Sequence, residues 1–299
     1  MAAPVPLFEP ALAEAAKLAE ESLNALLPKP QGPEARLLEA MRYAALGGGK
    51  RLRAFLLMQS GGLFGVDRRS LGRAAAAVEC VHAYSLVHDD LPAMDDDDMR
   101  RGKPAAHKAF DEATAILAGD ALLTLAFGLL SSAETHGDPF VRCELVSRLA
   151  HASGHAGMVG GQMMDIALEG TAPAPPQITR LQRMKTAALI SYCCEAGAIL
   201  GKASQPMRNA LANFGNEIGL AFQIADDILD AEGDAAEMGK ATAKDAARGK
   251  TTVVAALGLE RARAQAEAMS RQALRHLDLF DEKADLLRAA AGFVVARRA

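Results

Sequence analysis

The sequence contains no tryptophan and only three tyrosines, and aromatic residues make up 4% of its 299 residues. Runs in which Val, Ile or Thr alternate with polar residues, the pattern of a half-buried strand, are also missing. Alanine and leucine dominate instead, and apolar residues recur at steps of three and four in residues 33–46 and 208–231. We therefore expect an all-α protein of ten or more helices, with residues 1–299 forming a single domain.

The chain has no excess of basic charge. Its net charge is −4 and its pI is about 6.0, which argues against a nucleic-acid-binding protein. An anionic ligand must therefore be bound by local basic clusters or by metal ions.

Paired cysteines are also missing. Cys80, Cys143, Cys193 and Cys194 show no CxxC spacing, so the sequence does not suggest a zinc site. In a chain of this size we expect all four to be buried thiols of a reducing compartment.

The first residues have neither the basic region nor the apolar region of a secretory signal. The longest apolar stretch, residues 115–133, carries Asp120 in its interior, where a charge would be costly in a bilayer. We expect this stretch to be a core helix. The prediction is a cytoplasmic protein without stable membrane insertion.

Aspartates gather at the end of an apolar segment. Asp89, Asp90 and Asp95 form the pattern DDxxxxD, and further aspartates continue to residue 98. Pro92 disfavours helix at the preceding residue, so the chain is expected to open here. Taken alone, this cluster also fits a solvated acidic loop.

A second acidic cluster follows the apolar residues 218–225. It contains Asp226, Asp227 and Asp230. Asp226 and Asp230 are four residues apart, so on a helix their Cβ atoms lie about 5–6 Å apart on one face, where like charges are destabilising. Taken alone, this cluster also fits an exposed helix end.

The two clusters together favour a metal site. Mg²⁺ prefers oxygen ligands and is commonly held by one or two carboxylates together with substrate phosphates. The cation is needed because one carboxylate–phosphate repulsion at about 4 Å amounts to roughly 4 kcal/mol at an effective dielectric constant near 20. EF-hand loops are excluded, because their glycine and terminal glutamate are absent at the required offsets.

Basic residues lie near these clusters. Residues 47–53, GGGKRLR, place Lys50, Arg51 and Arg53 after a flexible turn, but the pattern lacks the first glycine and the Ser or Thr of a nucleotide-binding loop. Arginine binds phosphate through paired donors. Any one of these basic residues also fits an ordinary surface charge. The further candidates for anion binding are His82, Arg100, Arg101, Lys185, Lys240 and Lys250.

Several segments in order along nearly the whole chain resemble the trans-isoprenyl diphosphate synthases, most closely the bacterial farnesyl diphosphate synthases. The segments that carry the resemblance are 47–53, 82–104, 160–165, 185–190, 222–230 and 239–252. The two Asp-rich motifs, in this order and at this spacing, are its most specific part. The resemblance implies one helical bundle around a central cavity, and a homodimer.

The resemblance also implies an activity. This is the Mg²⁺-dependent condensation of isopentenyl diphosphate with dimethylallyl or geranyl diphosphate, which gives farnesyl diphosphate and releases pyrophosphate. The expected number of Mg²⁺ ions is three, with Mn²⁺ as an alternative ion. Asp89 and Asp95 would bind the ions from one side, with Asp90 assisting. Asp226 would bind them from the other side, with Asp230 in support.

The same resemblance assigns the remaining polar residues. Those that would hold the allylic diphosphate are Arg100, Lys185, Lys240 and Lys250. Those that would hold isopentenyl diphosphate are Gly49, Lys50, Arg53, His82 and Arg101. The catalytic residues would be Lys185, Thr186 and Gln223, the last two directing oxygen atoms toward the developing carbocation. Gln162 and Asp165, one helical turn apart, are expected to brace the site by hydrogen bonds.

Product length is expected to depend on the helix that precedes Asp89. Tyr84 lies five residues before Asp89, where the resemblance implies a bulky aromatic floor and C15 products, and Ser85 lies beside it. Ordinary core packing is the alternative for Tyr84.

Three rival functions remain open. A geranylgeranyl diphosphate synthase would differ only in pocket depth. A terpene cyclase would need one diphosphate, leaving residues 47–53 and Arg101 without a ligand. A non-catalytic partner subunit or a metal-binding structural bundle would show no turnover.

Overall fold

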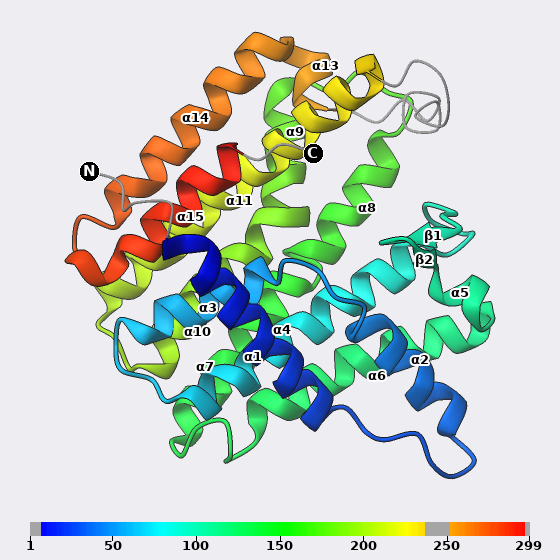
Figure 1. The fold of residues 1–299 in the computed structure, drawn as a ribbon. Helices are drawn as coiled ribbons and strands as arrows, with labels where there is room; N and C mark the ends of the chain where they lie inside the picture. Colours follow the sequence, from blue (N-terminus) through cyan, green and yellow to red (C-terminus); the bar gives the residue numbers. More distant parts are fainter. Residues whose placement is uncertain (1–6, 237–251, 297–299) are drawn as a thin grey trace. The chain divides into compact units, whose positions relative to one another are not determined.

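A computed structural model describes residues 7–236 and 252–296 of the chain (Figure 1). The prediction of an all-α protein with ten or more helices is confirmed for these residues. The α-helices are α1 (Phe8–Leu26), α2 (Ala35–Ala45), α3 (Leu52–Gly62), α4 (Arg68–Asp89), α5 (Ala106–Ala109), α6 (Glu112–Ser131), α7 (Pro139–Ser153), α8 (Met158–Leu168), α9 (Pro175–Gln182), α10 (Ala188–Leu200), α11 (Gln205–Ala236), α13 (Val253–Leu257), α14 (Leu259–His276) and α15 (Asp285–Ala296).

Three short elements lie between these helices. Strands β1 (Met99–Arg100) and β2 (Lys103–Pro104) form a small antiparallel hairpin, which the scarcity of strand signals did not predict. One π-helical segment, η2 (Arg183–Ala187), and one 3-10 turn, η3 (Glu282–Ala284), complete the described residues.

The chain divides into two compact units. The N-terminal unit comprises Glu9–Val146 and Ile199–Lys202, and the C-terminal unit comprises the described parts of Met1–Phe8, Ser147–Ala198 and Ala203–Ala299. The single domain remains a prediction.

Helix α4 forms the core of the N-terminal unit. It packs against α2, α3 and α6, and its alanine-rich stretch Ala74–Val78 is fully buried. Small side chains let neighbouring helices approach from several sides, and a helix that is apolar all round belongs in a core. Asp67 caps its first turn by accepting hydrogen bonds of 3.0 Å from the backbone N–H groups of Arg69 and Ser70.

A buried ion pair joins α3 to α4. Arg51 immediately precedes α3, and its Nη1 donates to Glu79 Oε2 at 2.8 Å. Arg51 also donates to the carbonyl oxygen of Ala45 at 2.6 Å and contacts Glu20. Both members of the pair are almost completely buried, so Arg51 is the member of residues 47–53 that serves the core.

Helix α6 carries the apolar stretch in which Asp120 lies. By length and composition alone it could cross a membrane, and no other helix in the described part of the chain passes that test. In the N-terminal unit α6 packs along α4, burying Ala118 and Leu122, which fits the expected core helix. Ile116 and Leu117 on its other side are exposed.

Helix α11 forms the core of the C-terminal unit, where it packs against η2, α13, α14 and α15 (Figure 1). One end of this helix is held in a cluster of buried aliphatic side chains. The cluster comprises Ile178, Ile224, Ile228, Val253, Ala262 and Ala266.

Two glycines one turn apart let α11 approach its neighbours closely. A Cβ atom on Gly215 would lie 2.6 Å from Cα of Ser191, and one on Gly219 would lie 2.5 Å from Cα of Ala187. Any larger residue would therefore push α11 away from η2 and α10.

One prediction about local structure was wrong. Cys143 is exposed on α7, whereas Cys80, Cys193 and Cys194 are buried as expected. The burial of a lone cysteine depends on which face of its helix packs, and α7 turns residue 143 outward.

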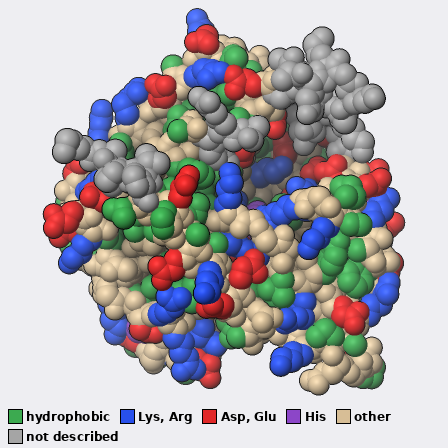
Figure 2. All heavy atoms as spheres, in the orientation of Figure 1, with side chains coloured by type: hydrophobic (Ala, Val, Ile, Leu, Met, Phe, Trp, Pro, Cys, Tyr) green, Lys and Arg blue, Asp and Glu red, His purple; other side chains and the backbone are tan. Residues whose placement is uncertain are grey.

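The surface has no extended region of one charge sign on the visible face. Figure 2 shows acidic and basic side chains interspersed there, with apolar side chains in small groups between them.

Candidate active site

The first acidic motif is closed into a compact loop by its own backbone. The N–H of Asp95 donates to the carbonyl oxygen of Asp89 at 2.7 Å, and the N–H of Asp97 donates to that of Asp90 at 3.2 Å. The loop therefore folds back onto the C-terminal end of α4. The first and third aspartates of DDxxxxD are brought next to each other, as expected for two ligands of one ion.

The middle aspartate of this motif is differently placed. Asp90 is 2% exposed, and Arg100 Nε on β1 donates to its Oδ1 at 2.9 Å. Burial raises the pKa of Asp90, and the hydrogen bond from Arg100 opposes that rise. The resemblance implied separate roles for these residues, in metal binding and in diphosphate binding. The structure joins them in an ion pair, and each role remains a prediction.

Three of the residues predicted to hold isopentenyl diphosphate surround one polar region of the N-terminal unit. Arg53 Nη1 lies 3.4 Å from His82 Nε2, while Arg53 Nε is buried without a hydrogen-bond partner. Burial and the neighbouring arginines, Arg53 foremost, lower the pKa of His82 well below its usual value. A neutral imidazole beside an unsatisfied guanidinium N–H is suited to receive an anion.

The glycine turn between α2 and α3 lies against Arg101, the residue that follows β1. Arg101 Nη1 donates to the carbonyl oxygen of Gly48 at 2.5 Å. Gly49 has φ of +113°, and a Cβ atom there would lie 2.9 Å from Arg101 Cζ, so only glycine fits. Lys50 follows on the exposed part of this turn.

A small cavity in the N-terminal unit opens beside these groups. Its polar lining includes Asp90, Arg100 and Arg101, and its apolar lining includes Leu86 and Val87 of α4. Of the basic residues predicted to bind diphosphate, Arg100 and Arg101 therefore line one cavity of this unit.

The predicted catalytic pair meets in the C-terminal unit. Thr186 Oγ1 on η2 donates to Gln223 Oε1 on α11 at 2.8 Å. The π-helical turn of η2 follows α9 directly, and such turns occur frequently at functional sites.

The hydrogen bonds of Asp227 were not predicted, because the sequence showed this residue only as a member of the second acidic cluster. It is 7% exposed, and its Oδ1 accepts from Gln223 Nε2 at 3.1 Å. Its Oδ2 accepts from Gln182 Nε2 at 3.1 Å and from the backbone N–H of Val253 at 3.0 Å. Burial raises the pKa of Asp227 to about 6. A signal was present, because the four-residue step from Gln223 to Asp227 places both on one helix face.

Asp227 fixes the orientation of the neighbouring amide. An ionised carboxylate only accepts hydrogen bonds, so the side of Gln223 that faces Asp227 must be its NH₂ group. The amide oxygen consequently faces Thr186. The other two aspartates of this motif, Asp226 and Asp230, lie less deeply on α11, Asp230 being exposed.

Lys185 of η2 is held by an acidic residue of α8. Its Nζ lies 2.5 Å from Asp165 Oδ2 on α8, so Asp165 makes the bracing contact expected of it. Gly161 of α8 permits this approach, since a Cβ atom there would lie 2.3 Å from the backbone nitrogen of Lys185. Gln162 leaves its buried Oε1 without a hydrogen-bond partner, so its bracing role remains a prediction.

The residues expected to control product length lie on α4. Tyr84 is 6% exposed and its ring meets that of His88 edge to face, with 5.7 Å between centroids. Ser85 donates to the carbonyl oxygen of His82 at 2.9 Å. Lys240 and Lys250 lie outside the described residues.

The sequence places these local sites in a known family. The family sequence model described as Polyprenyl synthetase matches residues 34–289. The chain belongs to the polyprenyl synthetase family. The family predicted from the motifs is thereby confirmed.

Relatives of this polyprenyl synthetase match it over nearly its full length. The farnesyl diphosphate synthase of Escherichia coli K12 is 45% identical over 97% of this chain and 99% of that protein. The farnesyl diphosphate synthase of Geobacillus stearothermophilus is 41% identical over 96% of each chain. Geranylgeranyl pyrophosphate synthase 12 of Arabidopsis thaliana is 42% identical over 92% of this chain and 78% of that protein.

A solved structure supports the same fold. The apo structure of an FPP/GFPP synthase from Zymomonas mobilis has a TM-score of 0.89 and 47% sequence identity, covering 98% of this chain and 100% of that chain. The first acidic motif belongs to the N-terminal unit and the second to the C-terminal unit. Their meeting around one set of ions remains a prediction.

Proposed function

We propose that this polyprenyl synthetase is a farnesyl diphosphate synthase. It would condense isopentenyl diphosphate with dimethylallyl diphosphate and then with geranyl diphosphate. The observation that carries the proposal is the near full-length similarity to farnesyl diphosphate synthases, 45% identity to that of Escherichia coli. The function is that of a prenyltransferase, as the sequence predicted.

The donor set of the first motif fits Mg²⁺. Asp89 and Asp95 offer carboxylate oxygens from adjoining points of one closed loop, and hard oxygen ligands are those that Mg²⁺ prefers. When bound, Mg²⁺ would offset the negative charge that develops on the leaving pyrophosphate. We expect Asp226 and Asp230 to supply the second side of the site. The three ions, and Mn²⁺ as an alternative, belong to this proposal.

The chain's basic residues would do the rest of the binding. Lys185, oriented by Asp165, is suited to an oxygen of the allylic diphosphate. Arg53, His82 and Arg101 are suited to the second diphosphate, because an unsatisfied guanidinium N–H is available there. Arg100, with Lys240 and Lys250 outside the described residues, would complete the allylic site.

The carbocation needs a different partner. The C–O bond of the allylic diphosphate breaks, the double bond of isopentenyl diphosphate attacks the resulting cation, and a proton is then lost. Amide and hydroxyl oxygens stabilise positive charge without capturing it. The Thr186–Gln223 pair, held by Asp227, supports this assignment.

The test is product analysis with labelled isopentenyl diphosphate. With dimethylallyl or geranyl diphosphate as primer and Mg²⁺ present, the main product is expected to be C15. A C20 main product would instead support a geranylgeranyl diphosphate synthase, which the Arabidopsis relative favours as the second candidate. Hydrocarbon released from one allylic substrate alone would indicate a terpene cyclase. No incorporation with any primer would indicate a non-catalytic subunit.

A homodimer is part of the proposal. Helix α6 exposes Ile116 by 44% and Leu117 by 55%, and α7 exposes Phe140 by 83%. Large apolar side chains exposed in this way favour burial against a second copy of the chain. We expect Leu117→Asp to shift the protein toward monomer in analytical ultracentrifugation. Leu279→Asp, a substitution of a comparably exposed leucine in the C-terminal unit, is the matched control.

The cytoplasmic location is proposed on the same footing. The relatives that resemble the chain are named farnesyl diphosphate synthases, and this name refers to a molecule that bears a diphosphate. Helix α6 is the one described helix with membrane-spanning character, and its buried face contributes to the core of the N-terminal unit.

A further inference from the structure

A histidine in the N-terminal unit is buried with both ring nitrogens unused. His107 on α5 is 6% exposed, and neither its Nδ1 nor its Nε2 has a hydrogen-bond partner. An imidazole always carries at least one N–H donor, and burying it unsatisfied is unfavourable. The proposed condensation assigns no role to this side chain. A ligand that bonds to a ring nitrogen would therefore stabilise His107 in this position.

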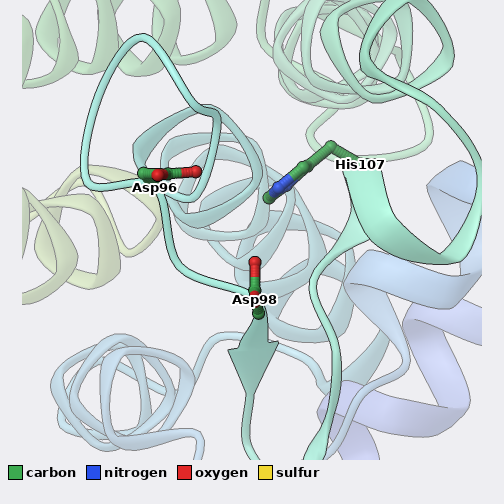
Figure 3. A group of neighbouring side chains, drawn as sticks. All are labelled: Asp96, Asp98 and His107. Carbon is green, nitrogen blue, oxygen red and sulfur yellow. The ribbon is translucent and has the colours of Figure 1, made fainter.

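Two carboxylates lie where a ligand shared with the ring would bind. One ligand atom each of Asp96, Asp98 and His107 lies within 4.8 Å of the other two, and Figure 3 shows the ring directed toward the space between the two aspartates. Asp96 adopts φ of +49°, a backbone conformation that aspartate tolerates better than most residues. Both aspartates are exposed, so small rotations can bring their oxygens closer.

We propose that Asp96, Asp98 and His107 bind one divalent transition metal ion, separate from the Mg²⁺ ions proposed at Asp89 and Asp95. One imidazole nitrogen with two carboxylate oxygens is a ligand set that suits Zn²⁺, Co²⁺ and Mn²⁺. Mg²⁺ is served by oxygen ligands instead, so the histidine discriminates between the two sites. Metal binding would satisfy one nitrogen of His107 and leave the other to water or to a small adjustment of the backbone.

One existing contact competes with the ion. Lys108 Nζ lies 3.0 Å from Asp98 Oδ1, so this carboxylate is already paired with a cation. Lys108 is exposed, and such a surface pair is weak. A divalent ion on the other oxygen of Asp98 leaves the lysine contact possible.

The bound ion would join the two ends of the β1–β2 hairpin. Asp98 immediately precedes β1, and His107 follows β2 by three residues. The backbone N–H of Ala105 already donates to the carbonyl oxygen of Asp98 at 2.8 Å. An ion bound by Asp98 and His107 would therefore close the hairpin more firmly at its base, and the hairpin presents Arg100.

The test is calorimetric titration of Zn²⁺ into the full-length protein held in excess Mg²⁺. We expect one additional Zn²⁺ per chain, with affinity reduced at least about tenfold in His107→Gln and in Asp98→Asn. His155→Gln, an exposed histidine of the C-terminal unit, is the matched control and is expected to bind as the wild type does. Co²⁺ is expected to give an absorption spectrum that His107→Gln abolishes.

Two results would overturn the proposal. The first is no Zn²⁺ uptake above that of His107→Gln. The second is uptake that is insensitive to both Asp98→Asn and Asp96→Asn. The two aspartates are exposed, so these variants are expected to fold even where His107→Gln does not. Hydrogen exchange of residues 99–106 provides an independent measurement, because bound Zn²⁺ should slow it in the wild type and in His155→Gln but not in His107→Gln.

Discussion

At the scale of single residues, the deeply buried aspartate of the second motif organises its neighbours. Asp226 and Asp230 carry the pattern that suggests ion binding, yet Asp227 between them receives three hydrogen bonds from three parts of the C-terminal unit. A carboxylate with this many donors acts as a fixed point, and the amide of Gln223 takes its orientation from it.

We predict that Asp227→Asn lowers kcat by up to about a hundredfold while changing KM less. The amide that replaces the carboxylate can donate as well as accept, so Gln223 is free to turn its oxygen away from Thr186. Steady-state kinetics with geranyl diphosphate measures both constants.

The control for that substitution is Gln182→Met. It removes one donor to Asp227 but leaves the contact with Gln223, so kcat should stay near the wild-type value. An unchanged kcat in Asp227→Asn would show that the carboxylate does not position the pair.

His82 gives a prediction about pH. Its pKa in the folded protein lies below the unfolded value of about 6.5, so the unfolded chain takes up a proton that the folded chain does not. The free energy of unfolding therefore carries the full contribution of neutral His82 above about pH 6.5. That contribution decreases as the pH falls toward the pKa of His82 in the folded protein. Through this one group, the free energy of unfolding changes by at most about 1.4 kcal/mol per pH unit.

The measurement is urea denaturation at a series of pH values from about 7 to about 5. His82→Gln should reduce the pH dependence of the free energy of unfolding by an amount that corresponds to about one proton. His155→Gln, on an exposed site, should leave that dependence as it is in the wild type. Equal slopes in wild type and His82→Gln would contradict the prediction.

At the scale of elements, the close packing of α11 against η2 holds the predicted catalytic pair together. Gly219 lies one turn before Gln223, and the residue it touches, Ala187, directly follows Thr186. The distance between the two helical backbones therefore sets the distance between hydroxyl and amide.

We predict that Gly219→Ala destabilises the protein by about 1–3 kcal/mol, because the new Cβ would overlap the backbone of Ala187. Gly292→Ala is the matched control. Gly292 is an exposed glycine of α15 with nothing within 4 Å of the added atom, so that change should stabilise by up to about 1 kcal/mol. Midpoints of urea denaturation give both values. Destabilisation of the same size in both variants would argue against a packing effect.

Helix α4 carries the prediction about product length. Replacing Tyr84 with alanine removes a buried ring, and the expected result is a shift from C15 to longer prenyl diphosphates. Tyr84→Phe keeps the ring and should keep the product. Chromatography of the products distinguishes the two, and identical spectra for Tyr84→Ala and wild type would leave Tyr84 as ordinary core packing.

The limits of sequence reasoning are clearest at this scale. The helices follow from apolar residues at three- and four-residue steps, so α2 and α11 were predicted from pattern alone. The π-helical turn of η2 was not predicted, and it packs closely against Gly161 and Gly219 of other helices, which are distant in sequence. Two other features were not predicted, the pairing of Asp90 with Arg100 and the burial of His107. Neighbouring sequence does not determine which side chains meet across a fold.

At the scale of the whole molecule, the distribution of charge decides whether the proposed substrates can bind. Acidic residues outnumber basic ones and the net charge is −4, yet the proposed substrates are themselves anionic. Each carboxylate left without an ion would repel a diphosphate by roughly 4 kcal/mol at about 4 Å and an effective dielectric constant near 20.

We predict that a chelator abolishes turnover and that added Mg²⁺ restores it. Helix content measured by circular dichroism should not change, because the described helices rest on apolar packing and on buried contacts such as Arg51–Glu79. Turnover that persists in excess chelator would contradict the metal requirement. Loss of helix content on chelation would indicate a structural ion instead.

The closed loop after α4 has a consequence for how such a protein can vary. Its backbone hydrogen bonds join Asp95 to Asp89 and Asp97 to Asp90, so the geometry of this motif is specified within one short piece of chain. Residues inserted or deleted between Asp90 and Asp95 would alter this loop while leaving α11 and its aspartates untouched. Evolution or design can therefore adjust one motif at a time, and a library of loop lengths at this position is a practical starting point for new product specificities.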